Sequence, residues 1–84
     1  MSYEIRFAKQ AFKDIKILIP KQRKKLQDIL IEIIAKNPYE GKKLKGNLEG
    51  NYSLHLNLQD RIVYSIDEEN KIVYIKRTRT HYES

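Results

Sequence analysis

The spacing of apolar residues changes twice along this chain, and these changes limit the possible folds more than any other feature. Residues 3–7 alternate apolar and charged side chains, which is typical of a strand with one buried face. From residue 9 to residue 34 the apolar positions recur every three or four residues, which predicts helices. After residue 51 the alternation returns. This order predicts a single α+β domain over residues 1–84, with helices packed on one face of a mainly antiparallel sheet.

Pro20 divides the helical stretch into two parts. The first helix is expected to begin near Lys9 and to end at Ile19, because proline cannot continue it. Proline is also suited to the first turn of a second helix. The apolar stripe of that second helix consists of Leu26, Ile29, Leu30, Ile33 and Ile34. We therefore predict an antiparallel helical hairpin, and the lysine-rich polar face of its second helix is open to RNA, to an acidic partner or to solvent alone.

Alternation in the second half of the chain predicts a hairpin of two strands. Asn37 and Pro38 close the helix, and a mobile loop rich in glycine and lysine is expected over residues 41–50. Residues 52–58 form the first strand, with an inward face made of Tyr52, Leu54, Leu56 and Leu58. After a turn at residues 59–60, residues 61–67 form the second strand. His55 and Arg61 then share the open face of this hairpin.

The last strand carries the most unusual combination of side chains. Residues 72–75 are all apolar, as expected for a strand covered on both faces, so the pattern assigns His81 to neither face. The strand completes a three-stranded antiparallel meander and runs directly into Lys76, Arg77, Arg79, His81 and Tyr82. Guanidinium, imidazole and phenol groups together can bind a phosphodiester and move protons on it, which indicates RNA-directed chemistry.

Composition excludes several classes of protein. The chain has no cysteine, and its two histidines lack a neighbouring carboxylate cluster, so we expect no metal and no cofactor. No apolar run approaches the roughly 20 residues of a membrane span, and no signal peptide is evident, so we expect a cytoplasmic protein without membrane contact. The formal charge of +6 favours nucleic acid or an acidic protein as the partner.

Four short segments carry a resemblance to a known family. They are Asn37-Pro-Tyr-Glu-Gly41, Leu44-Lys-Gly-Asn-Leu-Glu-Gly50, Arg61-Ile-Val-Tyr64 and Thr80-His-Tyr-Glu83. In this order and spacing they resemble the RelE/ParE superfamily of bacterial and archaeal toxins, and within it the Txe/YoeB branch of messenger-RNA endonucleases. The resemblance covers nearly the whole chain and implies the RelE-like fold.

The same resemblance implies a function. Such a toxin belongs to a type II toxin–antitoxin module and cuts messenger RNA in the A site of the 70S ribosome, beside 16S ribosomal RNA. Attack by the 2′-hydroxyl leaves a 2′,3′-cyclic phosphate and a 5′-hydroxyl, without a metal ion. An acidic antitoxin of the RelB or YefM kind is expected to hold the toxin inactive in a hetero-oligomer.

The family's site residues map onto matching positions of this chain. Arg61 matches the phosphate-contacting arginine, His81 the proton-transferring histidine and Tyr82 the tyrosine at the end of the chain. His55 lies on a strand where relatives place a lysine, arginine or histidine that faces the RNA. The cations expected to bind RNA are Lys42, Lys43, Lys45, Arg77 and Arg79.

One position departs from the family pattern. Relatives of the YoeB kind have a glutamate, thought to be the general base, where this chain has Lys42. The candidates for that role are His55, Glu49 and Glu40, with His55 placed first because of its predicted face. Two alternative functions stay open: a ParE-like toxin that inhibits DNA gyrase, and a non-catalytic module of the same fold that binds RNA or antitoxin.

Overall fold

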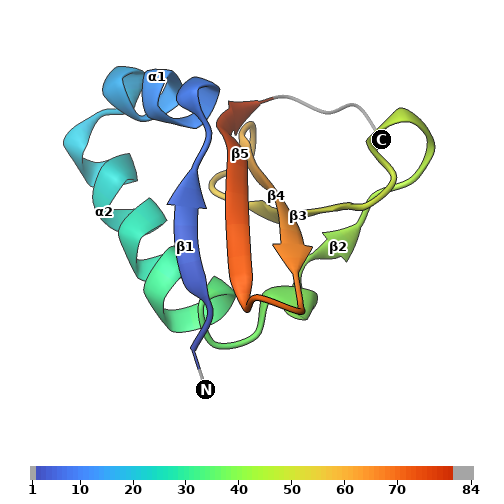
Figure 1. Cartoon of the computed structure of the whole chain (residues 1–84). Helices are drawn as coiled ribbons and strands as arrows, with labels where there is room; N and C mark the ends of the chain where they lie inside the picture. The colour runs from blue at the N-terminus through green and yellow to red at the C-terminus, as the bar shows by residue number, and fades with distance from the viewer. Residues whose placement is uncertain (1, 81–84) are drawn as a thin grey trace.

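The computed structural model describes residues 2–80 of the chain, with Thr80 described by its backbone alone. It shows a twisted five-stranded sheet with two helices along one side (Figure 1). The helices are α1 (Lys9–Ile17) and α2 (Pro20–Ile29), and a short π-helix over Leu30–Ile34 continues α2. The strands are β1 (Glu4–Phe7), β2 (Lys42–Lys43), β3 (Asn51–His55), β4 (Arg61–Asp67) and β5 (Ile72–Thr80). Two 3₁₀ turns, Pro38–Glu40 and Gly46–Leu48, lie in the connection between the helices and β3.

The strands lie in the order β1-β5-β4-β3-β2. The predicted meander is confirmed, because β3 pairs antiparallel with β4 and β4 pairs antiparallel with β5. The first strand pairs parallel with the last, Ile5 of β1 lying opposite Val73 of β5. The fold is therefore the predicted α+β arrangement, with a mixed sheet whose N-terminal strand forms one edge.

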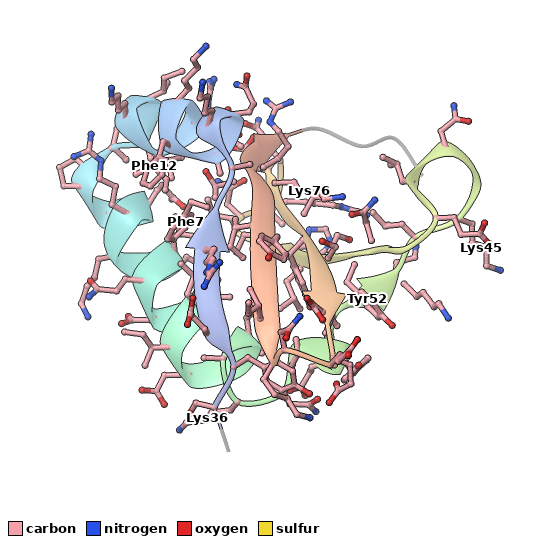
Figure 2. The ribbon with its side chains drawn as sticks, in the orientation of Figure 1. Phe7, Phe12, Lys36, Lys45, Tyr52 and Lys76 are labelled. Carbon is pink, nitrogen blue, oxygen red and sulfur yellow. The ribbon has the colours of Figure 1, made fainter. Side chains whose placement is uncertain are left out.

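The hydrophobic core lies between the helices and one face of the sheet. Its buried members include Leu26, Leu30, Ile34, Ile62, Tyr64, Val73 and Ile75. At the α1 end, the rings of Phe7 in β1 and Phe12 in α1 lie 5.3 Å apart (Figure 2). Because the helices cover one face, the polar side chains that alternate with the core residues on β3 and β4 lie on the other face, which we call the open face.

The second helix begins at Pro20 as the sequence predicts, but the first ends at Ile17, two residues before the predicted end at Ile19. Leu18 and Ile19 have extended backbones, and Pro20 is the first residue of α2. The side chain of Arg23 donates to the carbonyl oxygens of Ile15 (3.1 Å) and Lys16 (3.0 Å). These bonds satisfy carbonyl groups that the end of α1 would otherwise leave without partners.

The first strand of the hairpin is shorter than predicted. The side chain of Asn57 accepts hydrogen bonds from the backbone N–H groups of Gln59 (2.8 Å) and Asp60 (2.6 Å), so the chain already turns at Asn57. Leu56 is buried as predicted, but Leu58 is fully exposed, and its assignment to the core was wrong. Asn57 forms a local turn that alternation alone does not reveal.

The last strand is longer than its apolar run and is not fully covered on both faces. Val73 and Ile75 are fully buried in the core, whereas on the opposite face Ile72 is buried and Tyr74 is 37% exposed, so that face of β5 is only partly covered. The expectation of burial on both faces is therefore confirmed for Ile72 and wrong for Tyr74. The strand continues through its charged residues to Thr80.

The segment predicted as a loop contains a short strand. Lys42 and Lys43 pair antiparallel with Ser53 and Tyr52 of β3 and form the far edge of the sheet. The sequence does not predict this strand, because its two residues are both lysines and show no alternation of apolar and polar side chains. Within residues 2–80, neither helix has the length and apolarity needed to cross a bilayer.

Candidate active site

The sheet brings His55 and Arg61 together as the sequence predicts. They are direct register partners where β3 ends and β4 begins. Directly paired residues of antiparallel strands project to the same face, with Cβ atoms roughly 5 Å apart. Tyr64 lies three residues further along β4 and is buried in the core, so alternation puts Arg61 on the open face. His55 is exposed and Arg61 is half-buried.

The same row of the sheet continues into β5. Thr80 is the register partner of Arg61 on the side opposite His55. His55, Arg61 and the backbone of Thr80 therefore lie side by side across three neighbouring strands. His81 and Tyr82, the other predicted catalytic residues, lie outside the described residues, but they follow Thr80 directly in the sequence.

The candidates for a general base lie at different places. Glu49 follows the turn Gly46–Leu48 and is exposed, in the connection between β2 and β3. Glu40 is also exposed and ends the turn Pro38–Glu40, in which the carbonyl of Pro38 accepts a bond of 2.6 Å from the hydroxyl of Tyr64. Burial raises the pKa of Tyr64 to about 12. Since Tyr64 projects to the core face, the turn that carries Glu40 lies on that side of the sheet, away from Arg61.

The three lysines of the connection to β3 are all exposed and lie differently. Lys42 pairs with Ser53, which is two residues before His55 and therefore on the open face, roughly 7 Å from it along the strand. Lys43 pairs with Tyr52 and projects to the opposite face. Lys45 lies in the connection beyond β2, well away from β5 (Figure 2).

The cations near the end of β5 separate into two groups. Arg77 donates to the carboxylate of Asp14 in α1, with Nε–Oδ2 and Nη2–Oδ1 distances of 2.8 and 3.2 Å. Arg79 is exposed, and its carbonyl oxygen accepts a further bond from Arg77. Lys76, which we did not include among the RNA-binding cations, is exposed and points away from α1 toward β3 and β2 (Figure 2).

Two bulges interrupt the pairing of β5 with β4 beyond Ile75. Tyr64 pairs with Ile75, Val63 with Arg77 and Arg61 with Thr80, so β5 has one residue more than β4 in each of these intervals. A bulge changes the direction of the side chains that follow it. Lys76 and Arg77 follow buried Ile75 and project to opposite sides, as neighbours in a strand do. The sequence could not assign them to faces because residues 72–75 are all apolar and give no starting point for the alternation.

Comparison with known proteins gives consistent matches over nearly the whole chain. The model of a family described as the YoeB-like toxin of bacterial type II toxin–antitoxin systems matches residues 7–82. The RelBE2 toxin–antitoxin complex from Mycobacterium tuberculosis contains a chain 28% identical to this one, with a TM-score of 0.86, covering 98% of this chain and 100% of that chain. No curated protein sequence matches.

Two structures from Staphylococcus aureus are also similar. A chain of the YoeB–YefM complex is 34% identical with a TM-score of 0.79, and the match covers 98% of this chain and 100% of that chain. The YoeB dimer is 32% identical with a TM-score of 0.81 and the same coverage.

Proposed function

The chain belongs to the YoeB-like toxin family of bacterial type II toxin–antitoxin systems, and from this premise we propose that it is an endoribonuclease that cuts messenger RNA in the ribosomal A site. One observation carries the proposal. His55 and Arg61 are register partners whose side chains project side by side from the open face of the sheet, and Arg61 also pairs with the residue that precedes His81. This row can offer a phosphodiester a positive charge and proton-transferring groups within one small area.

The proposed reaction uses the substrate's own 2′-hydroxyl as nucleophile. A base removes the 2′-hydroxyl proton, the oxygen attacks the adjacent phosphorus, and an acid protonates the departing 5′-oxygen as the P–O bond breaks. The products are a 2′,3′-cyclic phosphate and a 5′-hydroxyl end. Arg61 stabilises the charge on the phosphorane oxygens, His81 is the acid, and Tyr82 stacks on a base or orients the phosphate.

The geometry favours His55 as the base, with Glu49 as the alternative. His55 is the register partner of Arg61, whereas Glu40 belongs to the turn whose Pro38 carbonyl is bound by Tyr64, a residue of the core face. Lys42 lies on the open face opposite Ser53, which is two residues before His55 on the neighbouring strand. It therefore adds positive charge where relatives have a glutamate.

We further propose that an acidic antitoxin of the RelB or YefM kind binds the toxin in the cytoplasm and forms a hetero-oligomer with it. The solved structures that the chain resembles include a RelBE2 complex and a YoeB–YefM complex. The formal charge of +6 suits an acidic partner. Large apolar side chains on the helical side of the molecule, Phe12, Ile19 and Ile31, are more than half exposed and offer contact area to such a partner.

The decisive experiment uses a messenger RNA with a single 2′-deoxynucleotide at the mapped cleavage position, programmed into 70S ribosomes. The purified toxin should cut the all-ribose message and leave a 5′-hydroxyl end, and it should not cut the 2′-deoxy message at that position. A 2′-deoxy substitution one nucleotide away is the matched control and should be cut normally. Cleavage of the 2′-deoxy message at the substituted position would disprove the proposed attack.

Substitutions separate the two candidate bases and the competing functions. His55→Gln should abolish cleavage if His55 is the base, whereas Glu49→Gln should do so if the loop carboxylate is. His81→Ala should abolish cleavage but leave ribosome binding unchanged. Wild-type toxin that arrests growth with intact transcripts and DNA damage would indicate a gyrase inhibitor, and wild-type toxin that binds ribosomes without cutting would indicate a non-catalytic module.

A further inference from the structure

Asp14 of α1 carries a buried carboxylate that the proposed chemistry does not use. Its side chain is 4% exposed. Besides the two bonds from Arg77, its Oδ2 accepts from the backbone N–H groups of Thr78 (3.1 Å) and Arg79 (3.4 Å), and its Oδ1 accepts from Gln10 (3.2 Å). One carboxylate of the first helix therefore binds three consecutive residues of the last strand.

These bonds lie where β5 departs from regular pairing with β4. Val63 of β4 pairs with Arg77 of β5, and Arg61 of β4 pairs with Thr80 of β5. The chain therefore advances by two residues on β4 but by three on β5. An extra residue in one strand leaves N–H groups that the neighbouring strand does not satisfy. The carboxylate of Asp14 supplies acceptors to the N–H groups within this bulge, so an α1 side chain does what the neighbouring strand does elsewhere.

The carboxylate is held in its charged form. Burial alone would raise the pKa of Asp14, but the bonds from Arg77, Thr78 and Gln10 outweigh burial and lower the pKa below its ordinary value. An ionised acceptor gives shorter and stronger bonds than a neutral one, so the bulge is held more firmly than an amide side chain could hold it.

We infer that Asp14 is a positioning residue for the endoribonuclease reaction: by binding the bulge at Arg77, Thr78 and Arg79, it fixes the point at which the chain passes Arg61 and continues into His81 and Tyr82. This inference rests on the proposed function. Asp14 is buried beneath β5 and acts through the strand rather than through contact with RNA. Arg77, expected from the sequence to bind RNA, serves here as the partner that keeps Asp14 charged.

The test is Asp14→Asn, which keeps the size of the side chain but removes its charge and one acceptor oxygen. The matched control is Asp28→Asn in α2, which removes an exposed carboxylate paired with Lys24 at 2.8 Å. Cleavage is measured on ribosome-bound message at a temperature where circular dichroism shows both variants folded. Asp14→Asn should lower kcat by about 10- to 100-fold with KM unchanged, because misplacement of reacting groups by an ångström costs that much. Asp28→Asn should leave both parameters unchanged.

Amide hydrogen exchange supplies a readout that does not depend on activity. In Asp14→Asn the amides of Thr78 and Arg79 should exchange at least about tenfold faster, while core amides of β4 keep their protection. A uniform rise over the whole sheet would show general loss of stability and would overturn the inference. So would wild-type kcat in Asp14→Asn, or a rise in KM alone.

Arg77→Gln keeps the inference testable if Asp14→Asn fails to fold. It removes the guanidinium but leaves the carboxylate and its backbone bonds, so kcat should fall less than in Asp14→Asn, again with KM unchanged. Where both variants fold, the double variant should be no slower than Asp14→Asn alone, because both changes affect one network. A rise in KM with normal kcat in Arg77→Gln would mean that Arg77 contacts RNA and would overturn its assigned role. Failure of the proposed function is distinguishable, because the wild-type toxin itself would then not cut.

Discussion

Arg61 is the register partner of His55 on one side and of Thr80 on the other, so the strand order alone places the guanidinium between the two histidine-bearing segments. His55 ends β3 and His81 follows the end of β5, and the two lie 26 positions apart in the sequence. β3 and β5 each reach this row through their own pairing with β4. The proposed site is therefore a property of the sheet and not of a local motif.

Arg61 should be sensitive even to a change that preserves its charge. Arg61→Ala is expected to lower kcat by about 10²- to 10³-fold, the usual effect of removing one donor to transition-state charge. Arg61→Lys should recover only part of this loss, because an ammonium group cannot donate two parallel bonds to a phosphate. Single-turnover cleavage of ribosome-bound message measures both effects. Lys36→Ala, which removes one positive charge from an exposed pair with Glu32, is the control and should cut normally. Equal rates for Arg61→Lys and wild type would contradict a bidentate role.

Much of this site could be predicted because it lies on regular elements. Alternation from Tyr52 to Leu56 and from Arg61 to Asp67 was sufficient to place His55 and Arg61 on one face, and the register confirms it. The parallel pairing of β1 with β5 could not be derived from pattern, since the sequence does not state which strands become neighbours. Periodicity predicted the α+β class and the meander, whereas the complete RelE-like fold was implied by the resemblance.

The end of β5 shows why the rest could not be predicted. The apolar run of residues 72–75 has no alternation, and the two bulges that follow interrupt the pairing of β5 with β4. Asp14 did leave a trace in the sequence, because Ala11, Asp14 and Leu18 follow helical spacing and all three are buried. An acid on the apolar stripe of a helix needs a cation or N–H groups nearby, and that requirement could have singled it out.

Gly41 should not tolerate a side chain even though its backbone permits one. Its φ of −70° is open to any residue, but an added Cβ would lie 2.2 Å from the hydroxyl of Tyr64 and 2.9 Å from the carbonyl oxygen of Ser53. That hydroxyl donates to the carbonyl of Pro38 at 2.6 Å. Gly41→Ala should therefore lower the free energy of unfolding in urea by about 1–3 kcal/mol through crowding.

Removal of the hydroxyl provides the control for this effect. In a Tyr64→Phe background, Gly41→Ala should cost less than in the wild type, since the closest contact is gone. Gly46→Ala, at a positive φ of 68° with no atom within 4 Å, should cost about 1–2 kcal/mol from backbone strain in either background. An unchanged cost of Gly41→Ala after Tyr64→Phe would exclude the hydroxyl as the source of crowding.

Asp14 should make stability depend on pH in the acid range. Because its pKa is lowered in the folded protein, the unfolded chain binds the proton more readily. The contribution of Asp14 to stability is therefore fully present above the ordinary aspartate pKa of about 3.9 and is lost as the pH falls through the lower pKa of the folded state.

At pH 7, the free energy of unfolding of Asp14→Asn, measured in urea, should be about 1–3 kcal/mol lower than that of the wild type, since buried donors lose an acceptor. The difference between the two proteins should shrink as the pH falls below about 3.9 and through the lower folded-state pKa of Asp14. A difference that stays constant from pH 7 to pH 2.5 would show that the charge of Asp14 contributes nothing.

Lys76 should bind the RNA backbone although it is not among the cations that the sequence singled out for this role. It is exposed, it precedes the residue that pairs with Asp14, and it points toward the open side of the sheet (Figure 2). A lysine that neutralises one phosphate of a single strand releases a counterion, so Lys76→Ala should reduce the slope of log Kd against log salt by about 0.7. Binding of a short messenger fragment to the catalytically inactive His81→Ala protein, measured by fluorescence anisotropy at several salt concentrations, gives this slope. Lys36→Ala in the same background removes an equal charge from the opposite end of the molecule and should leave the slope unchanged (Figure 2). Because an overall loss of positive charge would affect both variants alike, a reduction confined to Lys76→Ala would identify a direct phosphate contact beside the proposed site, and equal slopes would refute it.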